Sequence, residues 1–137
     1  MACPCFDPGE RLPGSNGSLG DLYAGLCRAA GAERPDERTT VEQCNIGYAR
    51  GRCPRFPEGE SSDAIRFSVA GHEGGFIRIL YSLERDHRPV SHGAVEFCTG
   101  TASFRGAMPN ASLERLAPAY VRSYLRRVGA GRAAAPR

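Results

Sequence analysis

The residues of this sequence with the clearest chemical potential are its six cysteines: Cys3, Cys5, Cys27, Cys44, Cys53 and Cys98. The N-terminus has no basic segment followed by an apolar one, so we expect no secretory signal and place the protein in the cytoplasm. Cytosolic thiols stay reduced. A group of cysteines there therefore indicates metal binding or thiol chemistry and not a disulfide framework.

Four of these cysteines form the ligand set that we predict: Cys3, Cys27, Cys44 and Cys53. Each lies in or beside a segment of loop-like composition, and two precede proline, at Cys3-Pro4 and Cys53-Pro54. Cysteine–proline pairs recur at iron–sulfur ligands. One physical reason is that proline holds the preceding residue extended and removes an amide donor. We predict that the four thiols converge on an iron–sulfur cluster of the [4Fe–4S] type.

Residues between the last two ligands could support such a cluster. Gly47 and Gly51 would let the backbone approach closely and donate N–H groups to sulfur. Arg50, with the nearby Arg52 and Arg55, would offset the negative charge of a thiolate-rich site. We therefore assign Gly47, Gly51 and Arg50 as residues that contact the cofactor.

Zinc is the competing metal. Structural zinc sites usually carry paired C-x₂₋₄-C motifs, whereas the closest cysteines here are Cys3 and Cys5, one residue apart. Thiol chemistry or plain burial of the cysteines remains a further alternative. Cys5 could be a spare ligand, a reactive thiol or a bystander. Cys98 ends a predicted strand, where a small packed residue is the simplest interpretation.

The segment CNIGYARGRCPRFP, which begins at Cys44, resembles a pattern found in small bacterial cysteine-rich proteins. Those proteins begin with a Cys-Pro-aromatic stretch and carry a CN-x-GYA…C-x-RFP block. The resemblance covers about the first 57 residues and the strand that follows. It implies that Cys3, Cys27, Cys44 and Cys53 act as one unit, and Cys5 stands where an aromatic residue is expected. It implies no activity.

The first 60 residues predict loops with short helical pieces. Residues 1–17 have loop composition, and a helix over 18–31 would begin at Ser18 and end at Gly31. Its apolar residues recur at helical spacing: Leu19, Leu22, Tyr23 and Leu26. A further turn, capped by Thr39 or Thr40, would run to Cys44.

The second half predicts a small sheet and a helix. Apolar residues alternate over 65–70, 77–83 and around Val95 and Phe97, which indicates three strands in an antiparallel meander. Residues 71–75 would turn the chain, and residues 84–93 would form a loop. A helix over 112–128, capped by Asn110 or Ser112, would pack on the sheet, with a kink or break at Pro118. The expected fold class is α+β.

Length and composition favour a single domain over residues 1–130. A chain of 137 residues with 41% hydrophobic residues can bury one modest core, to which a metal would add stability. Within it, residues 1–60 would bind the metal and residues 64–128 would form the core. Residues 129–137 are expected to be a disordered tail. No apolar run is long enough to span a membrane.

All 18 basic residues are arginine, and the net charge is +3. The lack of lysine excludes Schiff-base chemistry and a P-loop. Arg122, Arg126 and Arg127 make the C-terminal region basic and could contact phosphates weakly. We favour the simpler interpretation, that they form the polar face of a helix.

No motif for a known reaction is present. Titratable residues gather between Glu84 and His92 and at His72-Glu73, and we interpret both as solvated turns. We therefore favour a non-catalytic iron–sulfur protein with an electron-transfer, redox-sensing or structural cluster and a redox or protein partner. One alternative is a zinc-stabilised module that binds nucleic acid or an acidic partner through arginines. The other is an enzyme that uses the cluster or a thiol, with His87 or Asp86 as acid–base.

Overall fold

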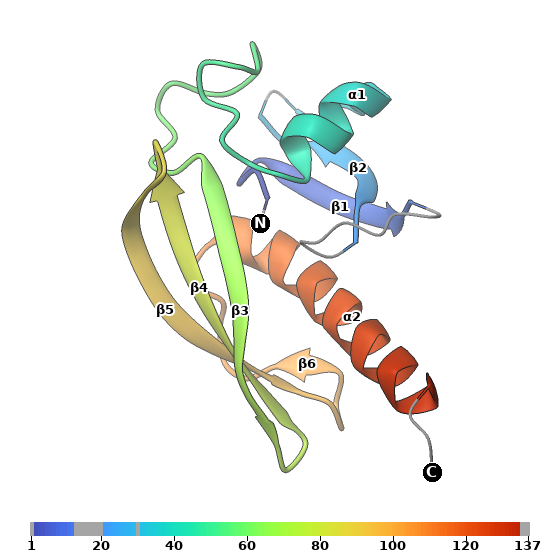
Figure 1. The fold of residues 1–137 in the computed structure, drawn as a ribbon. Coiled ribbons are helices and arrows are strands. Elements are labelled where there is room, and N and C mark those ends of the chain that lie inside the picture. The colour runs from blue at the N-terminus through green and yellow to red at the C-terminus, as the bar shows by residue number, and fades with distance from the viewer. Residues whose placement is uncertain (1, 13–20, 30, 135–137) are drawn as a thin grey trace.

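The computed structural model describes residues 2–12, 21–29 and 31–134. Two antiparallel sheets, β1-β2 and β3-β4-β5-β6, accompany one long helix, α2, which runs along one side of the larger sheet (Figure 1). The α+β class is confirmed, whereas the predicted three-stranded meander is a four-stranded sheet with a second, separate sheet. The elements are β1 (Phe6–Arg11), β2 (Tyr23–Cys27), α1 (Glu37–Thr39), the π-helical turn η1 (Thr40–Cys44), β3 (Ala64–Glu73), β4 (Phe76–Arg85), β5 (Arg88–Cys98), β6 (Ser103–Phe104) and α2 (Ala111–Ala134).

The larger sheet follows the predicted alternation of apolar residues. Ile77 and Ile79 of β4 are fully buried, and Val95 and Phe97 of β5 lie beside them at 9% exposure. Val121 of α2 packs into the same cluster, so the helix covers this face as expected. The fourth strand is short and pairs only with the end of β5, and its two residues give too brief a pattern to detect in the sequence.

The predicted loop over residues 84–93 is wrong. β4 continues to Arg85 and β5 begins at Arg88, so Asp86 and His87 alone form the turn. Both have positive φ, 50° and 66°. Such a two-residue turn matches the twist of a hairpin, and aspartate and histidine tolerate this backbone region better than most residues. Because residues 84–93 are mostly polar, their composition did not indicate that they extend β4 and begin β5.

The predicted helix over residues 18–31 is also wrong where it can be compared. Ser18 and Leu19 lie outside the described residues, and Tyr23–Cys27 forms β2, paired with β1. A Cβ at Gly25 would lie 2.1 Å from the Asp7 carbonyl oxygen. Glycine therefore lets β2 approach β1 closely, and the same residue weakens a helix.

The helical turn that ends at Cys44 is present, but its cap differs from the prediction. Asp36 caps it, because its carboxylate accepts a hydrogen bond from the Thr39 amide at 2.7 Å. Thr40 lies inside the turn, where its hydroxyl donates to the Asp36 carbonyl oxygen. The chain then passes from α1 into η1 without a break.

Helix α2 begins as predicted and ends later. The Asn110 side chain accepts a hydrogen bond from the Leu113 amide at 2.8 Å, which is an N-cap contact. Pro118 lies within the single helix and beyond its first turn, so it removes a backbone hydrogen bond there without ending the helix. The helix continues to Ala134, so residues 129–134 are helical and not the predicted disordered tail. Residues 135–137 lie outside the described part of the chain.

The N-terminal segment belongs to the main core. Ala2 bridges to Ile65 of β3, and Cys3, Cys5 and Phe6 pack in one cluster with Leu113 and neighbouring residues of α2. The Tyr23 hydroxyl, at the start of β2, donates to the Ala119 carbonyl oxygen of α2 at 3.0 Å. These contacts hold the cysteine-bearing strands against the sheet and the helix.

Candidate metal centre

The first two cysteines share one tight turn. The Phe6 amide donates to the Cys3 carbonyl oxygen at 3.0 Å, which closes a β-turn with Pro4 at its second position. The Cys3 amide donates to the Cys44 carbonyl oxygen, and the Arg115 side chain of α2 donates to the Pro4 carbonyl oxygen at 2.7 Å. The turn is thus fixed to both the η1 region and the core helix.

The other three predicted ligands lie at the end of a short element or in the loop that follows one. Cys27 is the last residue of β2 and exchanges two backbone hydrogen bonds with Glu33, so the intervening chain folds back. Cys44 ends η1, and π-helical turns are frequent at functional sites. The Cys53 amide donates to the Ala49 carbonyl oxygen, which holds the cysteine in a turn of the following loop.

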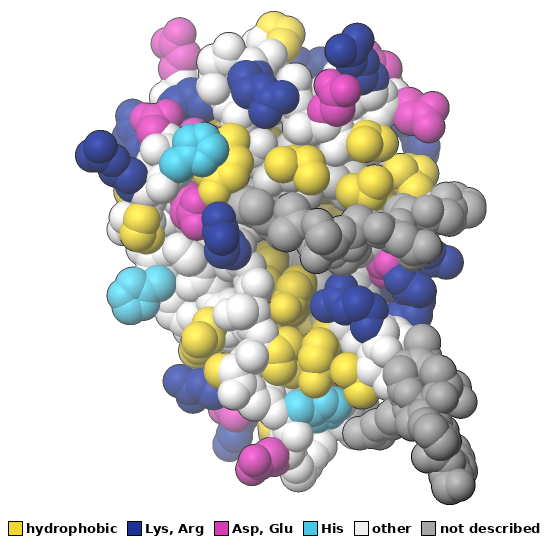
Figure 2. All heavy atoms as spheres, in the orientation of Figure 1, with side chains coloured by type: hydrophobic (Ala, Val, Ile, Leu, Met, Phe, Trp, Pro, Cys, Tyr) yellow, Lys and Arg dark blue, Asp and Glu magenta, His cyan; other side chains and the backbone are white. Residues whose placement is uncertain are grey.

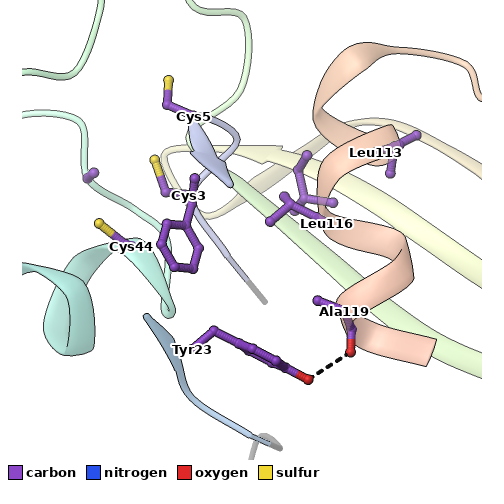
Figure 3. Close-up of a cluster of buried hydrophobic side chains, with 10 residues drawn as sticks. Cys3, Cys5, Tyr23, Cys44, Leu113, Leu116 and Ala119 are labelled. Atoms are coloured by element: carbon purple, nitrogen blue, oxygen red, sulfur yellow. Dashed lines mark hydrogen bonds between the residues drawn. The ribbon is translucent and has the colours of Figure 1, made fainter. Parts of the chain in front are cut away.

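All four predicted ligands line one hollow of about 310 Å³ of empty space, part of it open to solvent. Cys5 lines it as well. In Figure 3 the sulfur atoms of Cys3, Cys5 and Cys44 lie on the side away from Leu113 and Leu116 of α2. The structure therefore brings five thiols from four segments of the chain to one place.

Neighbouring thiols shift one another's pKa values. A hydrogen bond to Cys5, with burial, raises the pKa of Cys3, and the same hydrogen bond lowers the pKa of Cys5. Burial, together with the nearby Cys27 and Cys53, raises the pKa of Cys44 to about 11. Several thiolates side by side are thus unfavourable without a cation, since each opposes ionisation of its neighbours. A bound metal would remove this penalty.

The walls of the hollow are mainly apolar, with one cation. Arg55 lies beside Cys44 and favours its thiolate. Apolar walls keep water from a metal centre and help to set its potential. The remaining lining residues are Phe6, Ala29, Gln43, Ala49 and Phe56.

The residues predicted to contact the cofactor do not line the hollow. A Cβ at Gly47 would lie 2.8 Å from the Ala64 Cβ, so this glycine permits close packing against β3. Gly51 faces open space. Arg50 stacks on Phe56 with its guanidinium 5.0 Å from the ring centre and lies 3.7 Å from an Asp63 carboxylate oxygen. The arginine that lines the hollow is Arg55, while Arg115 of α2 acts on Cys5 from beside the turn.

The CN-x-GYA block positions the loop through several contacts. Asn45 is buried, and its side chain accepts from the Tyr23 amide and donates to the Tyr23 carbonyl oxygen, both at 2.8 Å. The amide thus pairs with β2 as a neighbouring strand would. Tyr48, which has φ of 61°, donates its hydroxyl to Glu84 at the end of β4. Ala49 is 2% exposed and forms part of the hollow's wall.

The titratable residues of the β4–β5 hairpin have a structural role at this end of the molecule. His87 stacks on the ring of Tyr48 with 3.9 Å between centroids. Glu84 is 8% exposed and pairs with Arg66 at 2.9 Å. Asp86 donates its backbone amide to the Asp63 carboxylate. These contacts join the hairpin to the cysteine loop. His72 hydrogen-bonds the Tyr124 hydroxyl of α2 instead.

The C-terminal arginines make contacts within the chain. Arg122 lies over the Tyr23 ring at 5.9 Å, and Arg126 pairs with Asp21. Arg127 lies against the Tyr120 hydroxyl. The side chain of Arg132 and all of Arg137 lie outside the described part of the protein. Cys98, at the end of β5, hydrogen-bonds Thr101 and does not line the hollow.

Several residues of the site were not assigned from the sequence: Cys5, which the sequence leaves as a spare ligand, a reactive thiol or a bystander, and lining residues such as Gln43 and Phe56. Cys5 has a signal, its proximity to Cys3 around a proline, which makes a turn that brings both thiols to one side. Phe56 and Gln43 had none, because an aromatic and an amide at these places are equally compatible with ordinary packing. They are recognised only once the loop closes over the thiols.

The donor chemistry fits a thiolate-bound metal better than a harder one. Among the described residues, no carboxylate or imidazole lines the hollow. Soft thiolate ligands favour iron–sulfur clusters, zinc or Cu(I). Within the described ranges, no three histidine, cysteine, aspartate or glutamate side chains lie close enough together to hold a metal ion as they stand. Ligand sulfurs lie roughly 4 Å apart around one zinc ion and roughly 6–7 Å apart around a cubane.

Comparison with known proteins adds no relative: no family model, curated protein or solved structure matches this chain. In the part of the chain that the structure describes, no helix has the length and hydropathy to cross a membrane. Basic and acidic side chains are interspersed at the end that carries the cysteine loops (Figure 2). The assignment of function therefore depends on the site itself.

Proposed function

We propose that this protein binds an iron–sulfur cluster, [4Fe–4S], through Cys27, Cys44, Cys53 and a thiol of the N-terminal turn, in the first place Cys3. The observation that carries the proposal is the hollow that five thiols line, with no carboxylate or imidazole from the part of the chain that the structure describes. Four thiolates complete a cluster of this type. The cluster would serve electron transfer, redox sensing or stabilisation of the loops, in the cytoplasm and with a redox or protein partner.

The surroundings of the thiols support this proposal. A cubane with four thiolates is anionic, and Arg55 lies where it can offset that charge. The rings of Phe6 and Phe56 and the methyl groups of Ala29 and Ala49 limit access of water. When bound, the cluster would accept or release one electron. The chain's own residues would hold it, shield it and set its potential.

Metal analysis and an absorption spectrum of anaerobically purified protein test the proposal. We expect iron and acid-labile sulfide in equal amounts and a broad visible band. Replacement of Cys27, Cys44 or Cys53 by alanine should abolish the band, whereas Cys98→Ala is the control that keeps it. One zinc ion per chain would instead support the zinc-stabilised binding module. Absence of metal after reconstitution with iron and sulfide would refute the cluster.

A further inference from the structure

The hollow holds one more thiol than a cluster requires. Cys3 and Cys5 occupy the first and third positions of the same β-turn, whereas Cys27, Cys44 and Cys53 come from three other segments. The fifth thiol is therefore a second donor at one corner of the site. The other three corners each have a single cysteine among the lining residues.

We propose that Cys3 and Cys5 are interchangeable ligands of that corner. The inference rests on the proposed function, because it assigns the ligands of the same cluster. When Cys5 replaces Cys3, the bond from iron to the Cys3 sulfur breaks and a bond to the Cys5 sulfur forms. The thiol proton passes from Cys5 to Cys3. No oxidant or reductant is consumed.

The geometry of the turn carries this step. Pro4 alone separates the two cysteines, and the backbone hydrogen bond from the Phe6 amide to the Cys3 carbonyl oxygen holds both in one turn. Both residues are 7% exposed, and both line the hollow. Neither thiol needs to leave the protein interior to exchange, because one turn of the chain holds both.

The turn is held at its backbone and not by its thiols. The Cys3 amide bonds to the Cys44 carbonyl oxygen, the Cys5 carbonyl oxygen accepts from the Arg28 amide at 2.8 Å, and Arg115 holds the Pro4 carbonyl oxygen. These bonds persist whichever sulfur is bound to iron. Loss of one thiol therefore leaves the turn in place for the other.

A double-mutant cycle tests the exchange in the full chain. We expect Cys3→Ala and Cys5→Ala each to keep iron and sulfide within about twofold of the wild type, and the double variant to lose about tenfold or more. Cys44→Ala should lose as much as the double variant. Cys98→Ala is the matched control. Reduced Cys3→Ala and Cys5→Ala should give distinct electron paramagnetic resonance spectra, since the ligand turn differs.

Alkylation of the wild-type holoprotein provides a test that needs no variant to fold. While the visible band persists, peptide mapping should find the label at either Cys3 or Cys5, never at both in one molecule. Label at Cys5 alone, or a Cys3→Ala variant as empty as Cys44→Ala, would overturn the exchange and leave the cluster assignment intact. A wild-type protein without iron and sulfide would instead refute the proposed function.

Discussion

Asn45 illustrates how single side chains position the cysteine loop. Its side-chain amide bonds both backbone groups of Tyr23, and it joins the Asn45 backbone N–H on the Thr40 carbonyl oxygen. A buried donor or acceptor without a partner costs about 1–3 kcal/mol. The asparagine therefore fixes the chain immediately after Cys44 and keeps that thiol beside the others.

Gly47 and Gly51 form a matched pair for a stability test. Both have positive φ, 89° and 78°, but only Gly47 lies against other atoms, the Ala64 Cβ and the Ala2 carbonyl oxygen. Gly51→Ala should cost about 1–2 kcal/mol of unfolding free energy for its backbone conformation. Gly47→Ala should cost about 1–3 kcal/mol more, because the added methyl group forces β3 and the N-terminus apart.

Urea unfolding of the two variants measures the difference. We expect Gly51→Ala to keep the metal content of the wild type, since this residue faces open space. Equal losses of stability in the two variants would show that the contact with Ala64 is not restrictive. A Gly51→Ala variant that is well folded but lacks metal would restore the earlier prediction that Gly51 contacts the cofactor.

At the residue scale, the sequence indicates the ligand types better than their surroundings. Cysteine–proline pairs and loop composition single out Cys3, Cys27, Cys44 and Cys53, and the structure gathers these four thiols. The same reasoning chose Arg50 because of its position in the chain, whereas the fold directs Arg50 toward Asp63 and brings Arg55 to Cys44. Which arginine faces a site depends on the path of the loop, and composition does not determine that path.

At the scale of elements, Asp21 connects the segment before β2 to α2. Its carboxylate accepts hydrogen bonds from Ser123 and Arg126, and its side chain is 3% exposed. Burial opposes ionisation of Asp21, but the two hydrogen bonds outweigh it and hold the pKa below the ordinary value of 3.8. The folded state therefore binds this proton less readily than the unfolded state does.

The lowered pKa of Asp21 predicts a loss of stability in acid. Its contribution is fully present above pH 3.8 and disappears as the pH falls through the folded-state pKa. Asp21→Asn should lower the unfolding free energy by about 1–3 kcal/mol at pH 7 and flatten its decline in acid. Urea unfolding from about pH 7 to about pH 3 measures both, with exposed Glu58→Gln as the control. A decline as steep as that of the wild type would show that other groups dominate.

The same helix carries the arginines that could bind nucleic acid. Arg122 lies over Tyr23 and Arg126 pairs with Asp21, so both would have to leave contacts within the chain to bind phosphate. We therefore expect weak, salt-sensitive binding at most. Each phosphate contact adds about one unit to the slope of log affinity against log salt. A fluorescence titration of Arg122→Ala, Arg126→Ala and Arg127→Ala measures that slope.

Two outcomes of this titration are informative. Variants with a flatter slope and unchanged metal content would place the contacts on α2, away from the thiols. Tight binding that survives all three replacements would show that the nucleic-acid surface lies elsewhere. Absence of binding at low salt would leave these arginines as the polar face of α2.

Some elements were easier to predict from the sequence than others. Strands β3, β4 and β5 and helix α2 have apolar residues at regular spacing, and each was predicted with the right type. β1 contains Asp7, Pro8 and Gly9, a composition typical of turns. It is a strand because Gly25 lets β2 approach it and because Phe6 is anchored in the core. Such tertiary contacts override local preference.

At the scale of the whole molecule, the thiols join two regions that differ in how many of their residues pack in the hydrophobic core. Residues 2–6 pack on Ile65 and Leu113 and bridge to β3. The segment from residue 31 to residue 57 contains α1, η1 and the loop to Cys53, and few of its residues belong to the core: Cys44, Ala49, Cys53 and Phe56. Two of these four are proposed ligands. A metal would therefore contribute most to the stability of this segment.

Removal of the metal should loosen the molecule unevenly. In chelated protein, we expect the amides of residues 31–57 to lose protection from hydrogen exchange. Few residues of this segment pack in the core, so its stability would depend on the metal bound by Cys44 and Cys53. Residues 64–98 and 111–128 should keep most of theirs, since the sheet and α2 bury their own apolar faces. Residues 2–6 should be intermediate, because their contacts with Ile65 remain.

The matched control is the Cys44→Ala variant treated with the same chelator, which should show the loosened pattern before and after treatment. Unchanged protection at residues 31–57 would mean that the loop is held by Asn45 and Tyr48 alone. Loss of protection throughout β3–β5 would mean that the cluster stabilises the whole domain. The uneven outcome follows from one feature of the fold, that the thiols connect a loop with a small core of its own to a sheet and helix that already have one.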